Sequence, residues 1–208
     1  MTAHSQPQKF DAPVTTKASP TPRGYLGASV RCGIDFIGQK GLSARVRADA
    51  TPPAIAAMDK PPSMMSWQDS PVLDELETLL AKHGGREACV ELGMFAARKL
   101  GGSIVQPVLR FALQLFGNTP KSLFANLDRF YPMVTRGLNY GYQPVSDSEG
   151  IVVLNAEGSN IPPALYDVTR GNLMYMMELS GAAGTVAPPE VKSSDDHRTV
   201  VHYTVRWG

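Results

Sequence analysis

The spacing of the apolar residues changes once along this chain, near residue 133, and that change limits the fold more than any other feature. Between residues 69 and 130 apolar residues recur every three or four positions, which is typical of helices with one buried face. From residue 133 onward they mostly alternate with polar residues, which is typical of strands. With one further helix over 162–180, this order predicts an α+β domain: a helical layer of four to five helices packed on a small, mostly antiparallel sheet.

Glycine and proline divide the helical part. The Asp-Ser-Pro motif at 69–71 predicts the start of a helix, which the Gly-Gly pair at 84–85 ends. A second helix runs from about residue 86 to the Gly-Gly pair at 101–102. A third, over 103–116, is apolar on nearly every face, which indicates a buried central helix. Thr119 and Pro120 begin a fourth.

The N-terminal part contains fewer apolar residues. Residues 1–24 are dominated by Pro, Thr, Ser, Ala and Gln, and we expect a disordered tail there, followed by one domain over 25–208. The runs at 30–37 and 42–48 flank Gly-Gln-Lys-Gly, and the second run alternates. This pattern predicts a β-hairpin whose second strand carries Arg45 and Arg47.

A closing hairpin is predicted over 185–207. In its last strand Thr199, Val201 and Tyr203 share one face, while His202 and Arg206 share the other. One face of the sheet is therefore expected to be buried and the other wet. We expect a partner to contact either this wetter face, through His202 and Arg206, or the basic strand that carries Arg45 and Arg47.

Several function classes receive no support from the sequence. Charge is balanced, with 20 Lys and Arg against 19 Asp and Glu, so no nucleic-acid partner is expected. Neither Gly-x-Ser-x-Gly nor a glycine-rich phosphate loop is present, and Cys32 and Cys89 form no metal-ligand pair. His197 and His202 lie near two aspartates, but a solvated turn explains them. We therefore expect no catalytic, metal or cofactor site, and no enzyme.

Location is predicted only by what the sequence lacks. We find no apolar stretch of the roughly 20 residues that a transmembrane helix needs, and no secretory leader. A cytoplasmic protein without a membrane span is the expectation.

Four segments resemble a known family. They are SLFANLDRFYPMVTRGLNYG, IVVLNAEG, IPPALYDVTRGNLMYMMELSGAAG and VVHYTVRW, all within residues 84–208. Together they resemble an uncharacterised paralogous family of myxobacteria. It is related to the superfamily of 4-vinyl reductase-type domains, heme nitric-oxide-binding domains and subunits of the TRAPP tethering complex. The resemblance implies a mixed α/β domain that binds small molecules or partners rather than turning over a substrate.

The chain departs from these relatives where they bind their ligands. The 4-vinyl reductase-type domains often carry cysteines near the last hairpin, and residues 191–201 contain none. The heme-binding relatives use a helical histidine and a Tyr-x-Ser-x-Arg signature. Tyr166 and Arg170 match the outer positions, but Val168 replaces the serine. These departures indicate that no cofactor is bound.

Two functions remain open. The preferred interpretation is a non-catalytic interaction or scaffold protein with a fully packed core, acting in signalling or regulation through protein contacts or self-association. The alternative is a sensor module that binds a small apolar ligand between the helices and the sheet. The residues expected to line its pocket are Cys89, Phe111, Leu115, Asn172 and Met176. An internal void of roughly a few hundred Å³ would favour the alternative.

Overall fold

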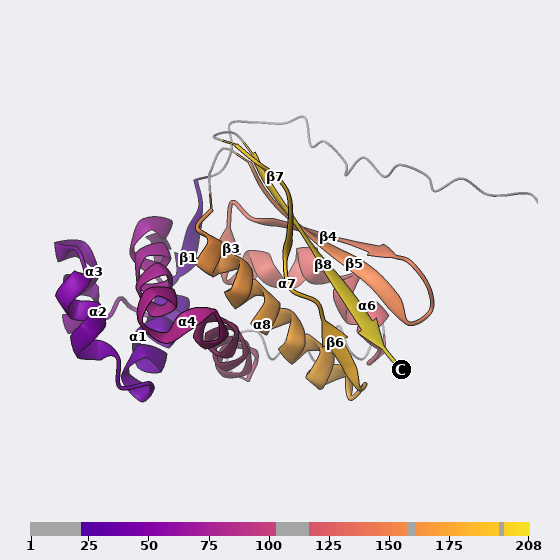
Figure 1. The fold of residues 1–208 in the computed structure, drawn as a ribbon, viewed down its shortest axis with the longest axis horizontal. Coiled ribbons are helices and arrows are strands. Elements are labelled where there is room, and N and C mark those ends of the chain that lie inside the picture. Colours follow the sequence, from indigo (N-terminus) through magenta and orange to yellow (C-terminus); the bar gives the residue numbers. More distant parts are fainter. Residues whose placement is uncertain (1–21, 103–116, 158–160, 196–197) are drawn as a thin grey trace, which may run out of the picture.

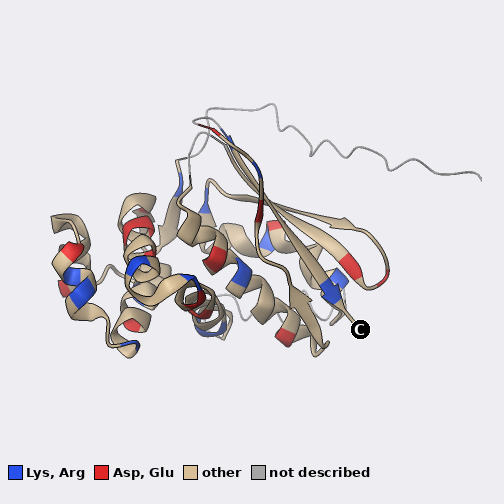
Figure 2. Ribbon diagram, viewed as in Figure 1, with Lys and Arg blue, Asp and Glu red and all other residues tan. Residues whose placement is uncertain are grey.

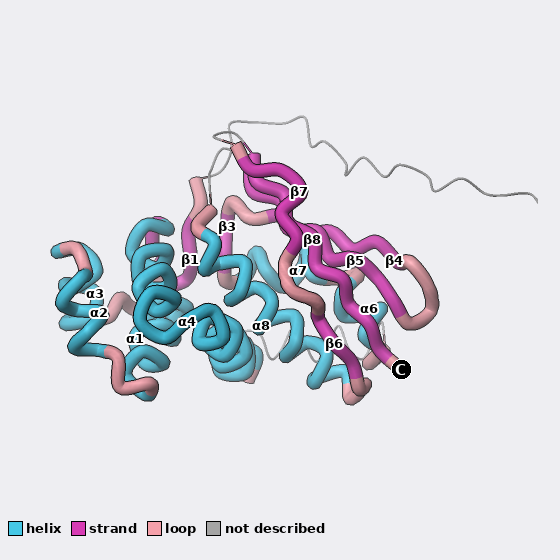
Figure 3. Tube along the Cα trace, in the orientation of Figure 1, coloured by secondary structure: helices cyan, strands magenta, loops and turns pink. Residues whose placement is uncertain are grey.

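Figure 1 shows the fold in a computed structural model, which describes residues 22–102, 117–157, 161–195 and 198–208. Helices α1 to α4 gather on one side and the larger sheet lies on the other, with α8 between them (Figure 3), so the predicted α+β class is confirmed. The predicted helix over 103–116 and nearly all of the predicted tail lie outside the described residues.

The described elements follow the chain in this order. The first half contains β1 (Gly24–Leu26), α1 (Gly27–Gln39), α2 (Ser43–Asp49), α3 (Pro52–Asp59), β2 (Trp67–Asp69) and α4 (Ser70–Gly101). The second half contains α6 (Pro120–Phe124), α7 (Leu127–Phe130), the 3-10 helix η1 (Tyr131–Met133), β3 (Thr135–Arg136), β4 (Asn139–Pro144), β5 (Glu149–Glu157), α8 (Pro163–Ser180), β6 (Gly184–Val186), β7 (Glu190–Ser194) and β8 (Arg198–Trp207).

The larger sheet is antiparallel and runs in the order β4-β5-β8-β6, and β7 also pairs with β8. Val152 of β5 lies opposite Tyr203 of β8, and Leu154 lies opposite Val201. All four side chains are fully buried, whereas His202 between them is half-exposed. The predicted division of β8 into a buried and a wetter face is therefore confirmed. A smaller sheet joins β2, β1 and β3.

Helix α8 packs on the larger sheet and against α4. The Tyr203 hydroxyl donates a hydrogen bond to the Tyr166 carbonyl at 3.1 Å, which ties β8 to α8. At the crossing of α4 and α8, a Cβ added to Gly93 would lie 2.0 Å from the Val168 carbonyl oxygen, and one added to Gly171 would lie 1.9 Å from that of Val90. The two helices are thus in backbone contact, which only glycine permits at both positions.

Charged groups also join α4 to α8. Arg86 donates two hydrogen bonds to Asp167, at 2.8 and 2.9 Å, and Arg98 donates one to Glu178 at 2.6 Å. Positive and negative residues are interspersed over the described helices and strands (Figure 2). Within the described ranges, no helix is long and apolar enough to cross a membrane.

The predicted break inside α4 is confirmed. Gly85 has φ +81°, so the helix ends there and a second one begins. Asp69 stands at the predicted start, but its carboxylate accepts a hydrogen bond from Arg136 at 3.1 Å instead of capping the helix. Thr119 caps α6 as predicted, because its hydroxyl accepts a hydrogen bond from the Ser122 amide at 3.2 Å.

The hairpin predicted over 30–48 is wrong, because these residues form helices α1 and α2. The buried residues Val30, Gly33 and Ile37 recur at helical spacing, and Phe36 packs against Phe95 of α4 with ring centroids 5.5 Å apart. Of the alternating residues in 42–48, only the Val46 side chain is buried. The runs at 30–37 and 42–48 are too short for the spacing of their apolar residues to distinguish a helix from a strand. Packing against α4 favours the helices.

Candidate functional site

A cavity that is partly open to the surface lies where α4, α8 and the segment from η1 to β4 meet. Its volume is about 120 Å³. This is below the volume expected for a drug-sized ligand, but a cavity of about 150 Å³ lined by apolar side chains already binds benzene. The described residues that line it are Tyr25, Ser29, Leu73, Glu77, Leu92, Ala96, Ala97, Leu100, Gly101, Phe130, Tyr131, Val134, Thr135, Leu138, Tyr140, Leu165, Val168, Thr169, Asn172, Tyr175 and Met176.

The helical walls follow from residue spacing. On the second half of α4, Leu92, Ala96 and Leu100 recur every four residues and face the cavity. On α8, Leu165, Thr169 and Asn172 recur every three or four residues on one face, with Val168 and Met176 beside them. Most of the wall is therefore apolar, and a few polar groups interrupt it at defined points.

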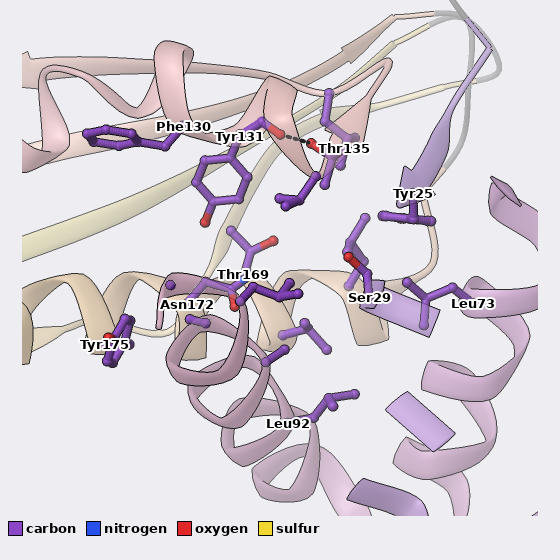
Figure 4. Close-up of a pocket in the computed structure, with 18 of the residues that line it drawn as sticks. Tyr25, Ser29, Leu73, Leu92, Phe130, Tyr131, Thr135, Thr169, Asn172 and Tyr175 are labelled. Atoms are coloured by element: carbon purple, nitrogen blue, oxygen red, sulfur yellow. Dashed lines mark hydrogen bonds between the residues drawn. The ribbon is translucent and has the colours of Figure 1, made fainter. Parts of the chain in front are cut away.

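One polar end of the cavity lies between η1 and α8. Figure 4 shows the ring of Tyr131 reaching toward Thr169 and Asn172. The hydroxyls of Tyr131 and Thr169 are buried, and neither forms a hydrogen bond of good distance and angle with a described residue. They do have polar neighbours, because Tyr131 interacts with Asn172 and Tyr140. Thr169 interacts in the same way with Tyr140 and Tyr203. The Tyr131 ring stacks on Tyr140, with centroids 3.7 Å apart. Burial raises the pKa of Tyr131 well above 10.0, so its phenol stays neutral.

The other polar end is formed by Glu77 on α4, one helical turn after Leu73. Figure 4 places Leu73 near Ser29 and Tyr25, away from Tyr131. The Glu77 side chain is 3% exposed, and its Oε2 has no hydrogen-bond partner within the described part of the chain. Burial, reinforced by the negative charge of Asp74, raises the pKa of Glu77 from 4.5 to about 8. The carboxyl is therefore mostly protonated at pH 7.

The nearest cation is already paired with another carboxylate. Arg23 donates hydrogen bonds to both oxygens of Asp74, at 2.9 and 2.5 Å, and the Tyr25 hydroxyl donates to the same carboxylate at 3.2 Å. Arg23 lowers the pKa of Glu77 only in part, after burial and Asp74 have raised it. Glu77 thus faces the cavity as an acid without a counter-ion of its own.

The structure places the residues predicted to line a pocket in three different ways. Asn172 and Met176 line the cavity. Cys89 is fully buried outside its described lining, with its thiol 3.7 Å from the Glu77 carbonyl oxygen, and burial raises the thiol pKa to about 12. Phe111 and Leu115 lie outside the described residues.

The residues predicted to contact a partner do not share a surface. Arg45 and Arg47 lie on α2, far from β8 with His202 and Arg206 (Figure 1). Arg47 is paired with Asp59 at 2.7 Å. Arg206 is likewise paired, with Glu149 at 3.1 Å. The predicted basic strand is a helix, so these four residues form no single patch.

The sequence prediction missed Glu77, Tyr131 and Thr169. A signal was present for Glu77, because it stands on the apolar face of its helix between Leu73 and Leu80. A charged residue at such a position is rarely buried without a partner. No comparable signal marks Tyr131 or Thr169, whose hydroxyls fit an ordinary core.

Comparison with solved structures identifies the fold. No protein-family model matches this chain, and no curated protein matches its sequence. An Fe(II) unliganded H-NOX mutant from K. algicida matches with a TM-score of 0.63 and 10% identity, covering 88% of this chain and 96% of that chain. An oxygen-binding H-NOX domain related to soluble guanylate cyclases matches with a TM-score of 0.56 and 11% identity, covering 87% and 92%.

A third match comes from work on heme distortion in the H-NOX family, with a TM-score of 0.56, 11% identity and coverage of 87% and 94%. This chain therefore has the H-NOX fold. The predicted resemblance to the heme nitric-oxide-binding branch is confirmed at the level of the fold.

One of these matches was studied for heme distortion, so a heme is the cofactor to compare with this cavity. Of the usual axial ligand types, the cavity offers a methionine, Met176, and tyrosines. Its described lining contains neither histidine nor cysteine. His83 instead contacts the Asp49 carboxylate at 2.8 Å, and His202 lies on the outer face of β8. Burial raises the pKa of the lining phenols Tyr25, Tyr131 and Tyr140, which disfavours a phenolate ligand. Residues 103–116 contain no histidine or cysteine in their sequence.

The groups that would bind heme propionates are also engaged elsewhere. The Tyr166 hydroxyl donates to the Ile161 carbonyl at 3.2 Å, and Arg170 Nε donates to the Val186 carbonyl at 3.0 Å. Neither residue lines the cavity, and no lysine or arginine belongs to its described lining. The described residues therefore do not fit a heme.

The interpretation preferred from the sequence, a scaffold protein with a fully packed core that acts through protein contacts or self-association, is wrong. The core contains a cavity. The fold is shared with an oxygen-binding H-NOX domain and with a protein studied for heme distortion. Both findings favour the alternative, a module that binds a small molecule.

Proposed function

We propose that this protein is a sensor module that binds one small, largely apolar molecule inside the cavity between α4, α8 and the η1–β4 segment. The observation that carries the proposal is the cavity of about 120 Å³ with mostly apolar walls. The H-NOX fold and the resemblance to a myxobacterial paralogous family in the same superfamily support it, and membership of that family is part of the proposal.

The volume limits the ligand to about one ring. Eight non-hydrogen atoms that each contribute about 0.5–0.8 kcal/mol give about 4–6 kcal/mol, which corresponds to a dissociation constant of about 0.05–1 mM. The few polar groups add selectivity rather than area. A porphyrin would find no histidine or cysteine ligand, and no cation for its propionates, in the described lining.

Binding without chemical turnover is also part of the proposal. The titratable groups of the described lining are one carboxyl and several phenols. Those with shifted pKa values, Glu77, Tyr25, Tyr131 and Tyr140, are all held toward the neutral form. A nucleophilic mechanism needs a nucleophile activated by a neighbouring base, and Cys89, with its pKa near 12, is not activated.

Calorimetric titration of the full chain with toluene and with benzyl alcohol tests this function. We expect saturable binding of at least one of them with one site per chain. Val168→Phe places a ring in the cavity and abolishes binding, whereas Val153→Phe adds the same ring on the half-exposed face of β5 and leaves binding intact. Ala96→Phe fills the cavity from α4 and serves if Val168→Phe does not fold.

Two results would overturn the proposal. One is the absence of saturable binding in a folded wild-type protein. The other is undiminished binding in both folded cavity-filling variants.

A further inference from the structure

The carboxyl of Glu77 identifies the chemical class of the ligand, on the premise that the cavity binds a small molecule as proposed above. We propose that the ligand is an amine of about one ring in size, and that Glu77 binds its ammonium group inside the cavity.

The first argument is that Glu77 faces the cavity without a partner. Glu77 is only 3% exposed, and its Oε2 has no hydrogen bond within the described ranges. A buried carboxylate is unfavourable unless it is paired and hydrogen-bonded. Glu77 is one of the residues that line the cavity, so a donor on the ligand can supply the missing bond.

The second argument is that the protein supplies no counter-ion there. The described lining contains neither lysine nor arginine. The two Nη groups of Arg23 donate to Asp74 and Tyr25, and its buried Nε has no hydrogen-bond partner among the described residues. Because Arg23 is already paired with Asp74, ionisation of Glu77 inside the cavity requires a further positive charge beside it. An ammonium group supplies that charge and forms charge-assisted hydrogen bonds, which are about twice as strong as neutral ones.

Other ligand classes fit these groups less well. An anion, such as a fatty acid, would meet the Glu77 carboxyl with no cation beside it. A neutral amide or alcohol needs only a neutral acceptor, which a glutamine of the same size would provide without the cost of burying an acid. The polar side chains of Tyr131, Thr169 and Asn172 line the same cavity and can contact a second, neutral group on the ligand.

Binding of an amine has a defined proton balance. At pH 7 the amine enters as its cation, the protonated Glu77 carboxyl releases its proton to the buffer, and the buried pair is neutral overall. The charged and titratable groups that act on Glu77 are Asp74, Arg23, Tyr25, Tyr140 and Cys89. Burial raises the pKa of both phenols and of the thiol, and Arg23 and Asp74 are paired with each other, so Glu77 is the group expected to lose the proton.

A matched series of single-ring probes tests the inference. Benzylamine, benzyl alcohol, toluene and benzoate differ only in the group on the ring, and each is titrated calorimetrically into the full chain at pH 7. Benzylamine is also titrated in phosphate and in MOPS, which differ in ionisation enthalpy and contain no primary amine. We expect benzylamine to bind at least tenfold more tightly than toluene, with release of up to one proton, and benzoate to bind weakest.

Two glutamine variants distinguish a specific role of Glu77 in binding from a general effect of replacing an acidic residue on α4. Glu77→Gln keeps a neutral acceptor of the same size. We expect this variant to bind benzylamine at least tenfold more weakly than the wild type does, and its affinity for toluene to change less than threefold. Glu87→Gln removes the same charge from an exposed position of α4 and leaves all four affinities unchanged. Melting curves of both variants establish that they are folded.

The possible outcomes distinguish a failure of the amine assignment from a failure of the proposed binding function. If toluene or benzyl alcohol binds as tightly as benzylamine, or if Glu77→Gln leaves benzylamine unaffected, the amine assignment is wrong while the binding function stands. If none of the four probes binds to the folded wild type, the proposed function itself fails.

Discussion

Replacing Glu77 by glutamine should change how the stability of the ligand-free protein depends on pH. The unfolded chain ionises this carboxyl near its ordinary pKa of 4.5, and the folded protein ionises it at about 8. Between these values unfolding releases one proton. The free energy of unfolding therefore falls by about 1.4 kcal/mol per pH unit on account of this residue.

The sign follows from which state holds the proton. Below about pH 4.5 both states are protonated and Glu77 contributes no pH dependence. As pH rises toward 8, only the folded state keeps its proton, so the folded protein is progressively disfavoured. From pH 5 to pH 8 the loss amounts to about 3–4 kcal/mol, a large fraction of the stability of a typical domain.

Urea denaturation of the wild type and of Glu77→Gln at pH 5, 6, 7 and 8 measures this contribution as a difference. We expect nearly equal free energies of unfolding at pH 5, and a glutamine variant that is more stable by about 3–4 kcal/mol at pH 8. Taking the difference cancels the titration of all other groups. A difference that stays constant across the series would refute the assignment of Glu77 as a buried, unpaired acid.

Four further outcomes follow from other contacts. Gly93→Ala and Gly171→Ala each force α4 and α8 apart, so each should lower the free energy of unfolding by about 2–3 kcal/mol in urea denaturation. The double variant should lose less than the sum of the two, because both substitutions disrupt the same helix contact. Thr169→Val removes a hydroxyl that forms no hydrogen bond of good geometry with a described residue, and it should leave the melting temperature unchanged or raise it; a fall of several degrees contradicts this. Arg86→Ala leaves the buried Asp167 carboxylate unpaired and should cost about 1–2 kcal/mol, moderated because the Arg86 side chain is 72% exposed. Titration with hemin should give no stoichiometric complex in the absorption spectrum, and a sharp one-to-one end point would contradict the misfit with heme.

The sequence predicted the fold well where a periodic segment was long. The ten residues of β8 alternate between buried and partly exposed positions along most of their length, and α8 carries a clear helical pattern bounded by proline and glycine. The hairpin predicted over 30–48 is wrong, because runs of seven or eight residues fit both a strand and a short helix. Their packing against α4, which the sequence does not display, decides between the two.

The cavity was predictable only in outline. The sequence places Asn172 and Met176 on one face of α8. It does not predict a cavity, because a cavity forms only where side chains from several elements leave a space unfilled. Glu77 lies more than 50 residues from Tyr131 in the sequence, and only the tertiary structure brings both to one cavity. The incomplete heme signature was readable from the sequence. The position of Glu77 on an apolar helix face was also readable, but its lack of a partner follows only from the tertiary structure.

The glycine crossing between α4 and α8 also determines which wall can respond to a ligand. Because the two backbones touch at Gly93 and Gly171, these helices form one stiff body, and neither can yield without breaking that contact. The opposite wall, from η1 to β4, is made of short elements, and β4 continues directly into the larger sheet through β5. A ligand in the cavity would therefore displace the η1–β4 wall rather than the helices. The outer face of the larger sheet is the surface whose structure we expect to change first when a ligand binds.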